Sequence, residues 1–450
     1  MNTTCTPRTT PPPVRSDGVP LPGPGDFVAR IHRGAHEIGG SCIELAAGGA
    51  RLVLDLGRPL GAAPDEDVAL PAVAGLAGPV PTGSGSDGAG PLLGVVFSHG
   101  HFDHVGLIGQ VDPTVPAWIG RAAADVLEAS AFFSPFGVRH PWAGHLRHGV
   151  PIDLGPFRIT PYLADHSAYD AYSLLVEAAG RRLLYTGDIR GHGRKARCFD
   201  ALCARPPADV DVLLCEGTRM GPRSEGDDAP SERDLEDALV EQMRATDGLV
   251  AVVSSAQNID RLVTVFRASR RAGRELAIDL HTATVAAATG RASIPQPGFD
   301  GLRVWLPRAQ RSRVLQAGEF GRTDAVRPLR IFPEELAARG AAVTVLTPSS
   351  GLSELVRSAG LGPDGLVVWS LWAGYLERTE GRSPLAAVEE ADVPVWHGHV
   401  SGHATPAQLA RLVRSVRPGR VVPIHTEHPE AYAALGAPVA AEPDGAWWAV

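Results

Sequence analysis

The sequence predicts a mixed fold in which a β-rich domain is interrupted by an inserted α/β domain with a parallel sheet. Up to about residue 216, short apolar runs such as FRITPYLADH and YSLLVEAAGRRLLYTGD alternate with turns, which is typical of β-strands. Beyond that residue, segments with helical spacing alternate with strand-like segments, the pattern of a parallel α/β sheet. Strand-like runs that end in histidines return near residue 395, so we expect the last part of the chain to complete the first domain.

The expected domain limits follow from these changes. Residues 1–25 are rich in proline, threonine and glycine and predict a disordered tail. Residues 26–216 would form the first part of the β-rich domain, 217–378 the insertion, and 379–450 the completion of the first domain. The turns AAGGA and EAAGRR predict two hairpins, and PVPTGSGSDGAGP at residues 79–91 predicts a flexible loop.

Local patterns give the elements of the insertion. In SERDLEDALVEQMRAT, a serine N-cap precedes acidic residues and apolar positions at helical spacing. The same reasoning predicts further helices in NIDRLVTVFRASRRAG, TATVAAATGRA and LSELVRSAG. Strands are expected in GLVAVVSS, ELAIDL, AAVTVLTP and GLVVWSLW, which alternate with these helices. A last helix, TPAQLARLVRSV, separates the two histidine-bearing runs near the end of the sequence.

Composition sets broad limits on the kind of protein. A chain of 450 residues with 44% hydrophobic and 20% charged residues is long enough for two or three soluble domains. No apolar run approaches the roughly 18 to 20 residues of a membrane helix, and the first residues lack a secretory signal, so we expect a cytoplasmic protein. The five cysteines lack paired CxxC spacing and predict neither a disulfide framework nor a zinc–thiolate site.

Arginine is concentrated between residues 303 and 330. The net charge of −8 argues against a uniformly basic surface, but a local arginine cluster can still bind phosphate oxygens. The alternative is a solvated helix face, which most charge runs turn out to be. Both interpretations stay open for this cluster: Arg303, Arg308, Arg311, Arg313, Arg322, Arg327 and Arg330.

The segment SHGHFDHVG carries the clearest chemical signal. It follows an apolar strand-like run and holds four side chains of metal-ligand type in one turn. Positions two apart can point the same way, while an adjacent aspartate and histidine face another direction, so one loop can serve two neighbouring metal ions. A single histidine here would more often be structural, but the cluster indicates a metal site. The four residues are His99, His101, Asp103 and His104.

Further candidate ligands lie where other strands are expected to end. These are His166 in LADHSAYD, Asp188 in LLYTGDIR and His425 in VVPIHTEH. Taken singly, His166 or Asp188 would more often be a turn residue than a ligand. Asp55, in LVLDLG, has the same placement but is better suited to fix the tautomer of a ligand histidine through a hydrogen bond.

These motifs, in this order, resemble the metallo-β-lactamase superfamily. Glu216 in LLCEGT, His403 in HVSGHA and His425 in VPIHTEH resemble the three extra motifs of its β-CASP nuclease branch. EIGGSCIEL, SSAQNIDRL and HVSGHA are most similar to the RNase J-type ribonucleases of bacteria and archaea. The resemblance covers about residues 27–435 and implies an αββα sandwich with an inserted parallel β-CASP domain.

The resemblance implies two metal ions, zinc by default and manganese as the alternative. A count of residues agrees, since each ion would obtain three or four nitrogen or oxygen ligands. The implied ligands are His99, His101 and His166 for one ion, Asp103, His104 and His425 for the other, and Asp188 bridging both.

The resemblance also implies a hydrolase that cleaves RNA phosphodiester bonds. A hydroxide activated by the two ions would attack the phosphorus, and His403 would protonate the departing oxygen. Glu216 would orient His403 by a hydrogen bond, while Asp103 and Asp55 complete the implied catalytic set. The structural alternative for His403 is a loop histidine flanked by glycine.

Substrate contacts are implied at two loops. His399 and Ser401 in HVSGH are candidates for holding a phosphate, with simple turn formation as their alternative. LTPSSGLSE stands where RNase J-type proteins have a GSQGE-like loop, and Ser349 and Ser350 are candidates to replace its contacts. His425 at the third extra motif favours RNA, because DNA-directed members tend to carry valine there.

We therefore expect a single-stranded RNA partner. The sequence ends soon after His425, so we expect a short form without the extra C-terminal domain of RNase J. Cleavage from the 5′ end and internal cleavage both stay open, as does a homodimer. The alternatives are a hydrolase of a small ester or thioester, a DNA-directed nuclease, and a non-catalytic partner in an RNA-processing complex. The inserted α/β domain argues against the first, and the intact ligand set against the last.

Overall fold

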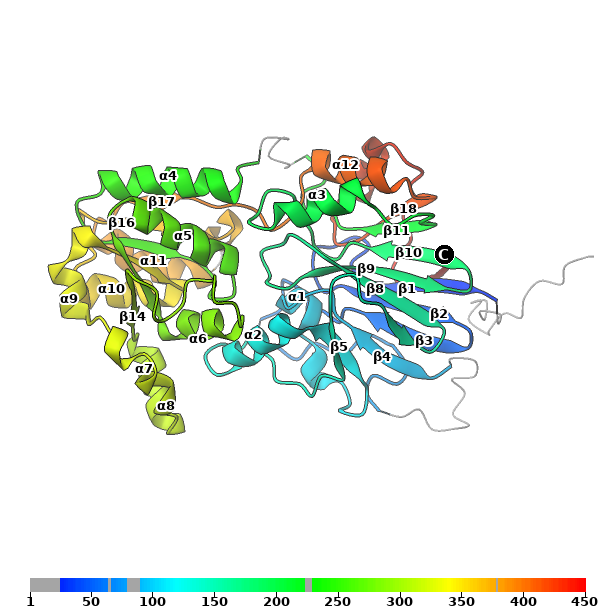
Figure 1. The fold of residues 1–450 in the computed structure, drawn as a ribbon, viewed down its shortest axis with the longest axis horizontal. Coiled ribbons are helices and arrows are strands. Elements are labelled where there is room, and N and C mark those ends of the chain that lie inside the picture. Colours follow the sequence, from blue (N-terminus) through cyan, green and yellow to red (C-terminus); the bar gives the residue numbers. More distant parts are fainter. Residues whose placement is uncertain (1–24, 64–65, 79–89, 223–228, 378) are drawn as a thin grey trace, which may run out of the picture.

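The computed structural model describes residues 25–63, 66–78, 90–222, 229–377 and 379–450. Residues 1–24 of the predicted tail at 1–25 and residues 79–89 of the predicted loop at 79–91 lie outside this part of the chain. Within the described residues there are one seven-stranded and two six-stranded sheets. Figure 1 shows two of these sheets together on the right and the third, with its helices, on the left.

The seven-stranded sheet collects strands from both ends of the described chain. Its order is β19-β1-β2-β3-β4-β5-β6, and β19 pairs antiparallel with β1 through Val28 and Ala449. The expected AAGGA hairpin is confirmed, because Ala47 of β2 pairs with Ala50 of β3. The strands are β1 (Phe27–Arg33), β2 (Cys42–Ala47), β3 (Ala50–Leu54), β4 (Leu92–Val96), β5 (Ala117–Gly120), β6 (Gly144–Leu146) and β19 (Trp447–Ala449).

The second sheet has the order β18-β11-β10-β9-β8-β7. The expected EAAGRR hairpin is confirmed by the pairing of Ala178 in β9 with Arg181 in β10. Beyond β10 the sheet continues with parallel strands, so β10, β11 and β18 all end at the same edge. The strands are β7 (Ile152–Leu154), β8 (Phe157–Leu163), β9 (Tyr172–Ala178), β10 (Arg181–Tyr185), β11 (Val212–Cys215) and β18 (Arg420–Pro423).

These two sheets pack face to face around a shared apolar core. Phe27 of the first sheet and Phe157 of the second meet edge to face, with ring centroids 6.0 Å apart. Helices α1 (Phe102–Val105) and α2 (Arg121–Ala131) cover the outer face of the first sheet. Helices α3 (Ala196–Ala204) and α12 (Pro406–Val416) cover that of the second. The expected αββα layering is confirmed, and we call this part the sandwich.

The third sheet is fully parallel and has the order β14-β13-β15-β12-β16-β17. Buried Val and Leu side chains fill both of its faces, as expected for a parallel sheet covered by helices on each side. We call residues 232–397, which form this sheet and its helices, the parallel unit. Its strands are β12 (Val250–Val253), β13 (Glu275–Asp279), β14 (Leu302–Trp305), β15 (Val343–Thr347), β16 (Leu366–Trp369) and β17 (Val395–His397).

Helices lie on both faces of the parallel sheet. The predicted serine N-cap is confirmed at the start of α4, where a capping box forms because the Ser231 and Asp234 side chains bond to each other's backbone nitrogens. One face carries α4 (Glu232–Ala245), α5 (Ile259–Arg271), α6 (Leu280–Ala288) and α7 (Arg308–Ala317). The other carries α9 (Pro333–Ala338), α10 (Leu352–Ser358) and α11 (Thr379–Glu390). Shorter elements are α8 (Gly321–Asp324), η1 (Ile108–Gln110), η2 (Arg327–Leu329), η3 (Gly340–Ala342), η4 (Ser349–Gly351), η5 (Ala373–Glu377) and η6 (Pro429–Leu435).

The parallel unit extends further along the chain than the sequence predicts. Strand β17 pairs with β16 through Trp369 and His397, and α11 packs against α10. The expected limit between residues 378 and 379 therefore falls inside the parallel unit, and the chain returns to the sandwich only after His397. The short β17 carries an exposed Val395 and a histidine, so its local pattern resembles the sandwich strand ends rather than an inserted strand.

The arginine-rich segment does not form a single helix face. Arg303 lies in β14, which the sequence does not predict, while Arg308, Arg311 and Arg313 lie on α7. Acidic and aromatic neighbours engage several of them: Arg303 faces Glu275 at 3.5 Å, and the Arg322 guanidinium lies 4.2 Å from the Phe132 ring centroid. Contacts within the protein therefore account for part of this cluster.

The carboxyl edge of the parallel sheet faces the sandwich. Gln257, in the loop after β12, donates its amide to the Phe136 carbonyl at 3.3 Å, and α6 packs against α2. Each helix described in the structure is too short or too polar to cross a bilayer.

One glycine fixes the approach of β3 to the SHGHFDHVG loop. A Cβ added at Gly57 would lie 1.7 Å from the Asp103 carbonyl oxygen and 2.9 Å from the carbonyl carbon of Gly40. Both are backbone atoms, which cannot rotate away.

We expect Gly57→Ala to lower the free energy of unfolding by about 1–3 kcal/mol or more, measured by urea denaturation. Gly61→Ala is the control, because its added Cβ meets nothing within 4 Å. Equal urea midpoints for the two variants would contradict this close contact.

Candidate metal centre and catalytic site

The candidate site lies where strands of both sandwich sheets end. The SHGHFDHVG loop follows β4, and Asp55 follows the parallel neighbour β3. In the second sheet, His166 and Asp188 follow β8 and β10, while Glu216 and His425 follow β11 and β18. Because all of these strands run in the same direction within their sheets, their carboxyl ends bring the side chains to one edge of the sandwich.

A first group joins three imidazoles and one carboxylate. Single ligand-type atoms of His99, His101, His166 and Asp188 all lie within 4.8 Å of one another. Nδ1 of His101 is 2.9 Å from Nε2 of His166, so the two ring nitrogens face the same point. Nε2 of His99 and of His166 lie 3.7 and 3.8 Å from Oδ2 of Asp188. The structure thus brings together the residues expected for one ion.

A second group shares Asp188 and adds Asp103, His104 and His425, again within 4.8 Å. Nε2 of His425 lies 3.2 Å from Oδ2 of Asp103, and Nε2 of His104 lies 3.3 Å from Oδ2 of Asp188. Asp188 therefore stands between the two groups, in the position expected of a bridging carboxylate.

The unpaired atoms of these groups fit metal binding. Within these two groups, four buried atoms have no hydrogen-bond partner among the described residues: Nε2 of His99, Nε2 of His104, and both carboxylate oxygens of Asp188. Buried polar atoms without a partner are costly and therefore rare. Imidazole with carboxylate is the donor set that zinc and other transition metals prefer. The site is thus suited to bind metal.

Asp55 supports the second group through a hydrogen bond with His104. Its Oδ2 accepts hydrogen bonds from Nδ1 of His104 at 2.8 Å, the Tyr185 hydroxyl at 2.7 Å and the Ser98 hydroxyl at 2.7 Å. Donation from Nδ1 leaves Nε2 of His104 free to face the cluster. Asp55 and His425 both adopt positive φ, 56° and 55°, a conformation that non-glycine residues adopt mainly where a site requires it.

Other partners orient the remaining rings. Nδ1 of His166 donates to the Gly402 carbonyl at 2.6 Å, which turns Nε2 toward the cluster. Nδ1 of His425 lies 2.8 Å from the Thr218 hydroxyl. Sequence reasoning identified Asp55 in this orienting position but missed Ser98, Tyr185 and Thr218. Their only signal is position, because each lies within seven residues of a candidate ligand or of Glu216.

Burial lowers the pKa of three ligand-type histidines, whereas the carboxylates of Asp188 and Asp103 outweigh burial at His104 and raise the pKa of that ring well above the usual range. Burial holds the pKa of His99 and His166 well below the usual range, and neighbouring imidazoles lower both further. Burial likewise lowers the pKa of His101 to about 4. These three rings are therefore neutral at pH 7, which is the form of histidine that binds metal ions.

His403 and Glu216 form a third group beside the first two. Nδ1 of His403 lies 3.3 Å from Oε2 of Glu216 and 3.7 Å from Oδ2 of Asp188. The Glu216 carboxylate is fixed by the backbone nitrogens of Ile189, at 3.1 Å, and Thr218, at 3.2 Å. Burial lowers the pKa of His403, but the charges of Glu216 and Asp188 outweigh it and raise this pKa to about 9. The side chain keeps 20% of its surface exposed, so a protonated imidazole borders solvent.

The candidate phosphate contacts fall on two loops of the carboxyl edge. His399 and Ser401 belong to the loop that carries His403, and Nδ1 of His399 lies 3.3 Å from the Ser370 carbonyl. The Ser401 hydroxyl accepts the backbone nitrogen of His403 at 3.2 Å. Ser349 and Ser350 begin η4 after β15, a strand that β12 separates from β16. The structure therefore brings His399 and Ser401 to the cluster more directly than Ser349 and Ser350.

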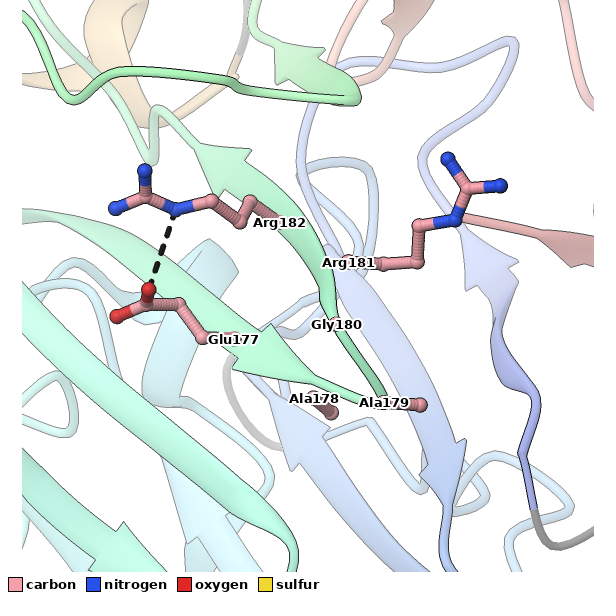
Figure 2. Close-up of a pocket in the computed structure, with 6 residues that line it drawn as sticks. All are labelled: Glu177, Ala178, Ala179, Gly180, Arg181 and Arg182. Atoms are coloured by element: carbon pink, nitrogen blue, oxygen red, sulfur yellow. Dashed lines mark ion pairs between the residues drawn. The ribbon is translucent and has the colours of Figure 1, made fainter.

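An open hollow of about 320 Å³ lies elsewhere, at the β9–β10 turn. Figure 2 shows its lining by Glu177 to Arg182, with Arg182 paired to Glu177 and Arg181 pointing away. This turn joins the ends of β9 and β10 that are opposite the ends next to His166 and Asp188. The hollow is thus separate from the candidate site.

Comparison with known proteins agrees with this geometry. Residues 68–247 match the Beta-lactamase superfamily domain, and residues 395–436 match the Zn-dependent metallo-hydrolase RNA specificity domain. Ribonuclease J of Mycobacterium tuberculosis (strain ATCC 25618 / H37Rv) is 27% identical over 439 residues, covering 90% of this chain and 70% of that protein. Ribonuclease J of Pyrococcus abyssi (strain GE5 / Orsay) is 23% identical over 362 residues, covering 75% of this chain and 74% of its own.

A solved structure shares the fold. The crystal structure of a protein of unknown function from Enterococcus faecalis V583 aligns with a TM-score of 0.76 and 20% identity, covering 94% of this chain and 100% of the other. Through its matches to a β-lactamase superfamily domain and an RNA specificity domain, this chain resembles ribonuclease J of the β-CASP branch within the metallo-β-lactamase superfamily.

Proposed function

We propose that this protein is a metal-dependent ribonuclease that hydrolyses phosphodiester bonds of single-stranded RNA with two zinc ions. The observation that carries the proposal is the pair of ligand groups that share Asp188, with His403 beside them. The ribonuclease J relatives and the match to an RNA specificity domain support RNA as the substrate. Manganese is the alternative metal.

The chain's own residues would hold the metal ions and keep them in place. Bound divalent ions supply Lewis-acid stabilisation of charge on a phosphodiester and activate water for attack. Asp55 and the Gly402 carbonyl would keep His104 and His166 in the tautomers that direct Nε2 to the ions. The proposed ligands are His99, His101 and His166 for one ion, Asp103, His104 and His425 for the other, and Asp188 for both.

His403 would deliver the proton that the departing oxygen needs. Its Nδ1 faces the Glu216 carboxylate, which leaves Nε2 to donate toward the substrate. Glu216 is itself held by two backbone nitrogens, so it can keep the imidazole in one orientation. An acid oriented by a fixed carboxylate is a common arrangement for general acid catalysis.

The surroundings of the loop that carries His403 suit an unpaired RNA strand. His399 and Ser401 would contact a phosphate, and Ser349 and Ser350 are further candidates on the same edge. Nε2 of His397 lies 3.1 Å from the Leu371 carbonyl, which brings the neighbouring Trp372 and Tyr375 near this loop. The two aromatic residues are 56% and 39% exposed, and their rings meet edge to face with centroids 5.7 Å apart. Exposed aromatic rings stack on unpaired bases of any sequence, which supports single-stranded RNA.

The proposal predicts cleavage of labelled RNA. We would incubate the purified protein, with its metal content recorded, with 5′-labelled single-stranded RNA, duplex RNA and DNA of matched sequence. The RNA would carry either a 5′ monophosphate or a 5′ triphosphate. We expect single-stranded RNA to be cut, and cleavage to stop after chelation and return with Zn²⁺ or Mn²⁺. Mononucleotide products would identify an exonuclease and internal fragments an endonuclease. Two bound metals with no cleavage of any polymer would refute the ribonuclease proposal.

Removing two ligands tests the metal assignment. The double variant His101→Ala/Asp188→Ala takes one imidazole from the first group and the carboxylate shared by both. We expect metal content by mass spectrometry and RNA cleavage both to fall to background, with an unchanged circular dichroism spectrum. His148→Ala is a matched histidine control, since His148 bonds to the Leu163 backbone nitrogen outside the cluster. Full metal content or full activity in the double variant would show that the ligands are wrongly assigned.

The acid role of His403 has a different signature. We expect His403→Ala to retain metal and to lower kcat on RNA by a factor of about 10² to 10⁴, because the leaving oxygen loses its proton donor. The measurement is steady-state kinetics combined with metal analysis of the same sample. Loss of metal in this variant would instead make His403 a ligand.

A further inference from the structure

Two fully buried arginines hold the loop that carries His403. Arg190 follows Asp188 by two residues in the sandwich, and Arg261 lies in the first turn of α5 in the parallel unit. Both are 0% exposed. A buried guanidinium is costly unless its donors are paired, so the partners of these two side chains show what the fold uses them for.

Arg190 connects the loop to the parallel unit. One terminal nitrogen donates to the Ser401 carbonyl at 2.9 Å, and the other donates to the Asp260 carboxylate of α5 at 2.6 Å. Asp165 of the sandwich lies 3.5 Å from the same guanidinium, and Glu232 of α4 lies 3.6 Å from it. One side chain thus binds a backbone atom two residues from His403 and charged groups of both units.

Arg261 reaches the other end of the same loop. It donates to the Ser370 carbonyl at 2.8 Å and to the Ser370 hydroxyl, which in turn donates to the Gly398 carbonyl. Its second terminal nitrogen lies 3.1 Å from Glu232 and 3.4 Å from the Val400 carbonyl. Residues 398–403 are therefore held at three backbone carbonyls: the parallel unit binds those of Gly398 and Val400, and Arg190 of the sandwich binds that of Ser401.

The position of this loop determines two groups of the candidate site. The Gly402 carbonyl accepts the Nδ1 proton of His166, and a Cβ at Gly402 would lie 2.7 Å from the Ser167 hydroxyl. The next residue, His403, faces Glu216 and Asp188. Because the loop packs this closely, a shift of its backbone displaces the His403 imidazole.

We propose that Arg190 and Arg261 are positioning residues for His403, which place its imidazole for proton donation only when the parallel unit is docked on the sandwich. This inference rests on the proposed function, since it concerns the acid of that reaction. Neither arginine touches the substrate. Each acts through the backbone of residues 398–403.

The alternative is a purely structural role, in which the arginines only hold the two units together. Arg194 provides the matched control for this alternative. It also bridges the units, through Glu236 at 2.5 Å and the Thr264 hydroxyl at 3.1 Å, and none of its hydrogen bonds among the described residues involves the loop. A change at Arg194 therefore weakens the contact between the units while leaving the Ser401 carbonyl bound.

The experiment compares two leaving groups. An RNA oligonucleotide needs its departing oxygen protonated, whereas a p-nitrophenyl phosphodiester of thymidine releases a stable phenolate without an acid. We would measure kcat and KM on both substrates for Arg190→Lys, Ser370→Ala, Arg194→Lys and His403→Ala, with metal content and urea midpoints. Lysine at 190 keeps a positive charge for Asp260 but lacks the second branch that reaches Ser401. Ser370→Ala removes the link to Gly398 and is small enough to keep the fold.

We expect Arg190→Lys and Ser370→Ala to lower kcat on RNA by about 10- to 100-fold, because displacing a catalytic group by about 1 Å costs up to this much. His403→Ala should likewise lower kcat on RNA. KM for RNA, metal content and turnover of the p-nitrophenyl substrate should stay within about threefold. Arg194→Lys should lower the urea midpoint while leaving kcat on both substrates within about threefold.

Three results would overturn the inference. The first is an equal loss on both substrates in Arg190→Lys and Ser370→Ala, and the second is loss of metal in either variant. The third is full RNA cleavage by Ser370→Ala together with full cleavage by Arg190→Lys. The proposed function fails separately: wild-type protein would cleave no RNA, or His403→Ala would lose both substrates equally. Both of these results come from proteins that retain Arg190 and Arg261, so they test the proposed function separately from the role of the two arginines.

Discussion

The buried carboxylate of Asp188 is the constraint around which the rest of the site is arranged. Its side chain is almost wholly removed from water, and neither oxygen has a hydrogen-bond partner among the described residues. A buried negative charge is tolerated only when positive charge or metal surrounds it. His104, His425 and His403 all lower the pKa of Asp188, against the effect of burial. The strand ends of both sandwich sheets converge here because each contributes a group to that balance.

Much of this arrangement follows from local sequence. A strand that ends at a buried edge places its next polar residue there, so the positions of Asp55, His166, Asp188 and His425 could be predicted from apolar runs followed by turn residues. Apart from Asp55, the groups that orient the ligand-type histidines could not be predicted. Tyr185 lies inside an apolar run, and the Gly402 carbonyl is a backbone atom without any sequence signal.

The errors in the fold have a similar origin. Strand β14 lies within an arginine-rich segment and was not predicted, whereas the strand-like run near residue 395 was predicted but assigned to the sandwich. Only strand pairing places β14 beside β13 and β17 beside β16, and such pairing is invisible in a local pattern. The contact between the units was also hidden, because Asp260 and Arg261 in the first turn of α5 look like ordinary residues of a capped helix start. Only the fold shows that they meet Arg190 and the loop of His403.

The pairing of β19 with β1 affects how the protein is made. Val28 and Ala449 are neighbours in the first sheet, so the sandwich gains this edge strand only after Ala449 has left the ribosome. The strands of the parallel unit lie between residues 250 and 397 and can pair with one another earlier, as domains generally fold as units during synthesis. His425 and β18 also emerge after the parallel unit. The nascent chain therefore carries a nearly complete inserted unit beside an open sandwich, and the second ligand group closes only after that unit has been made.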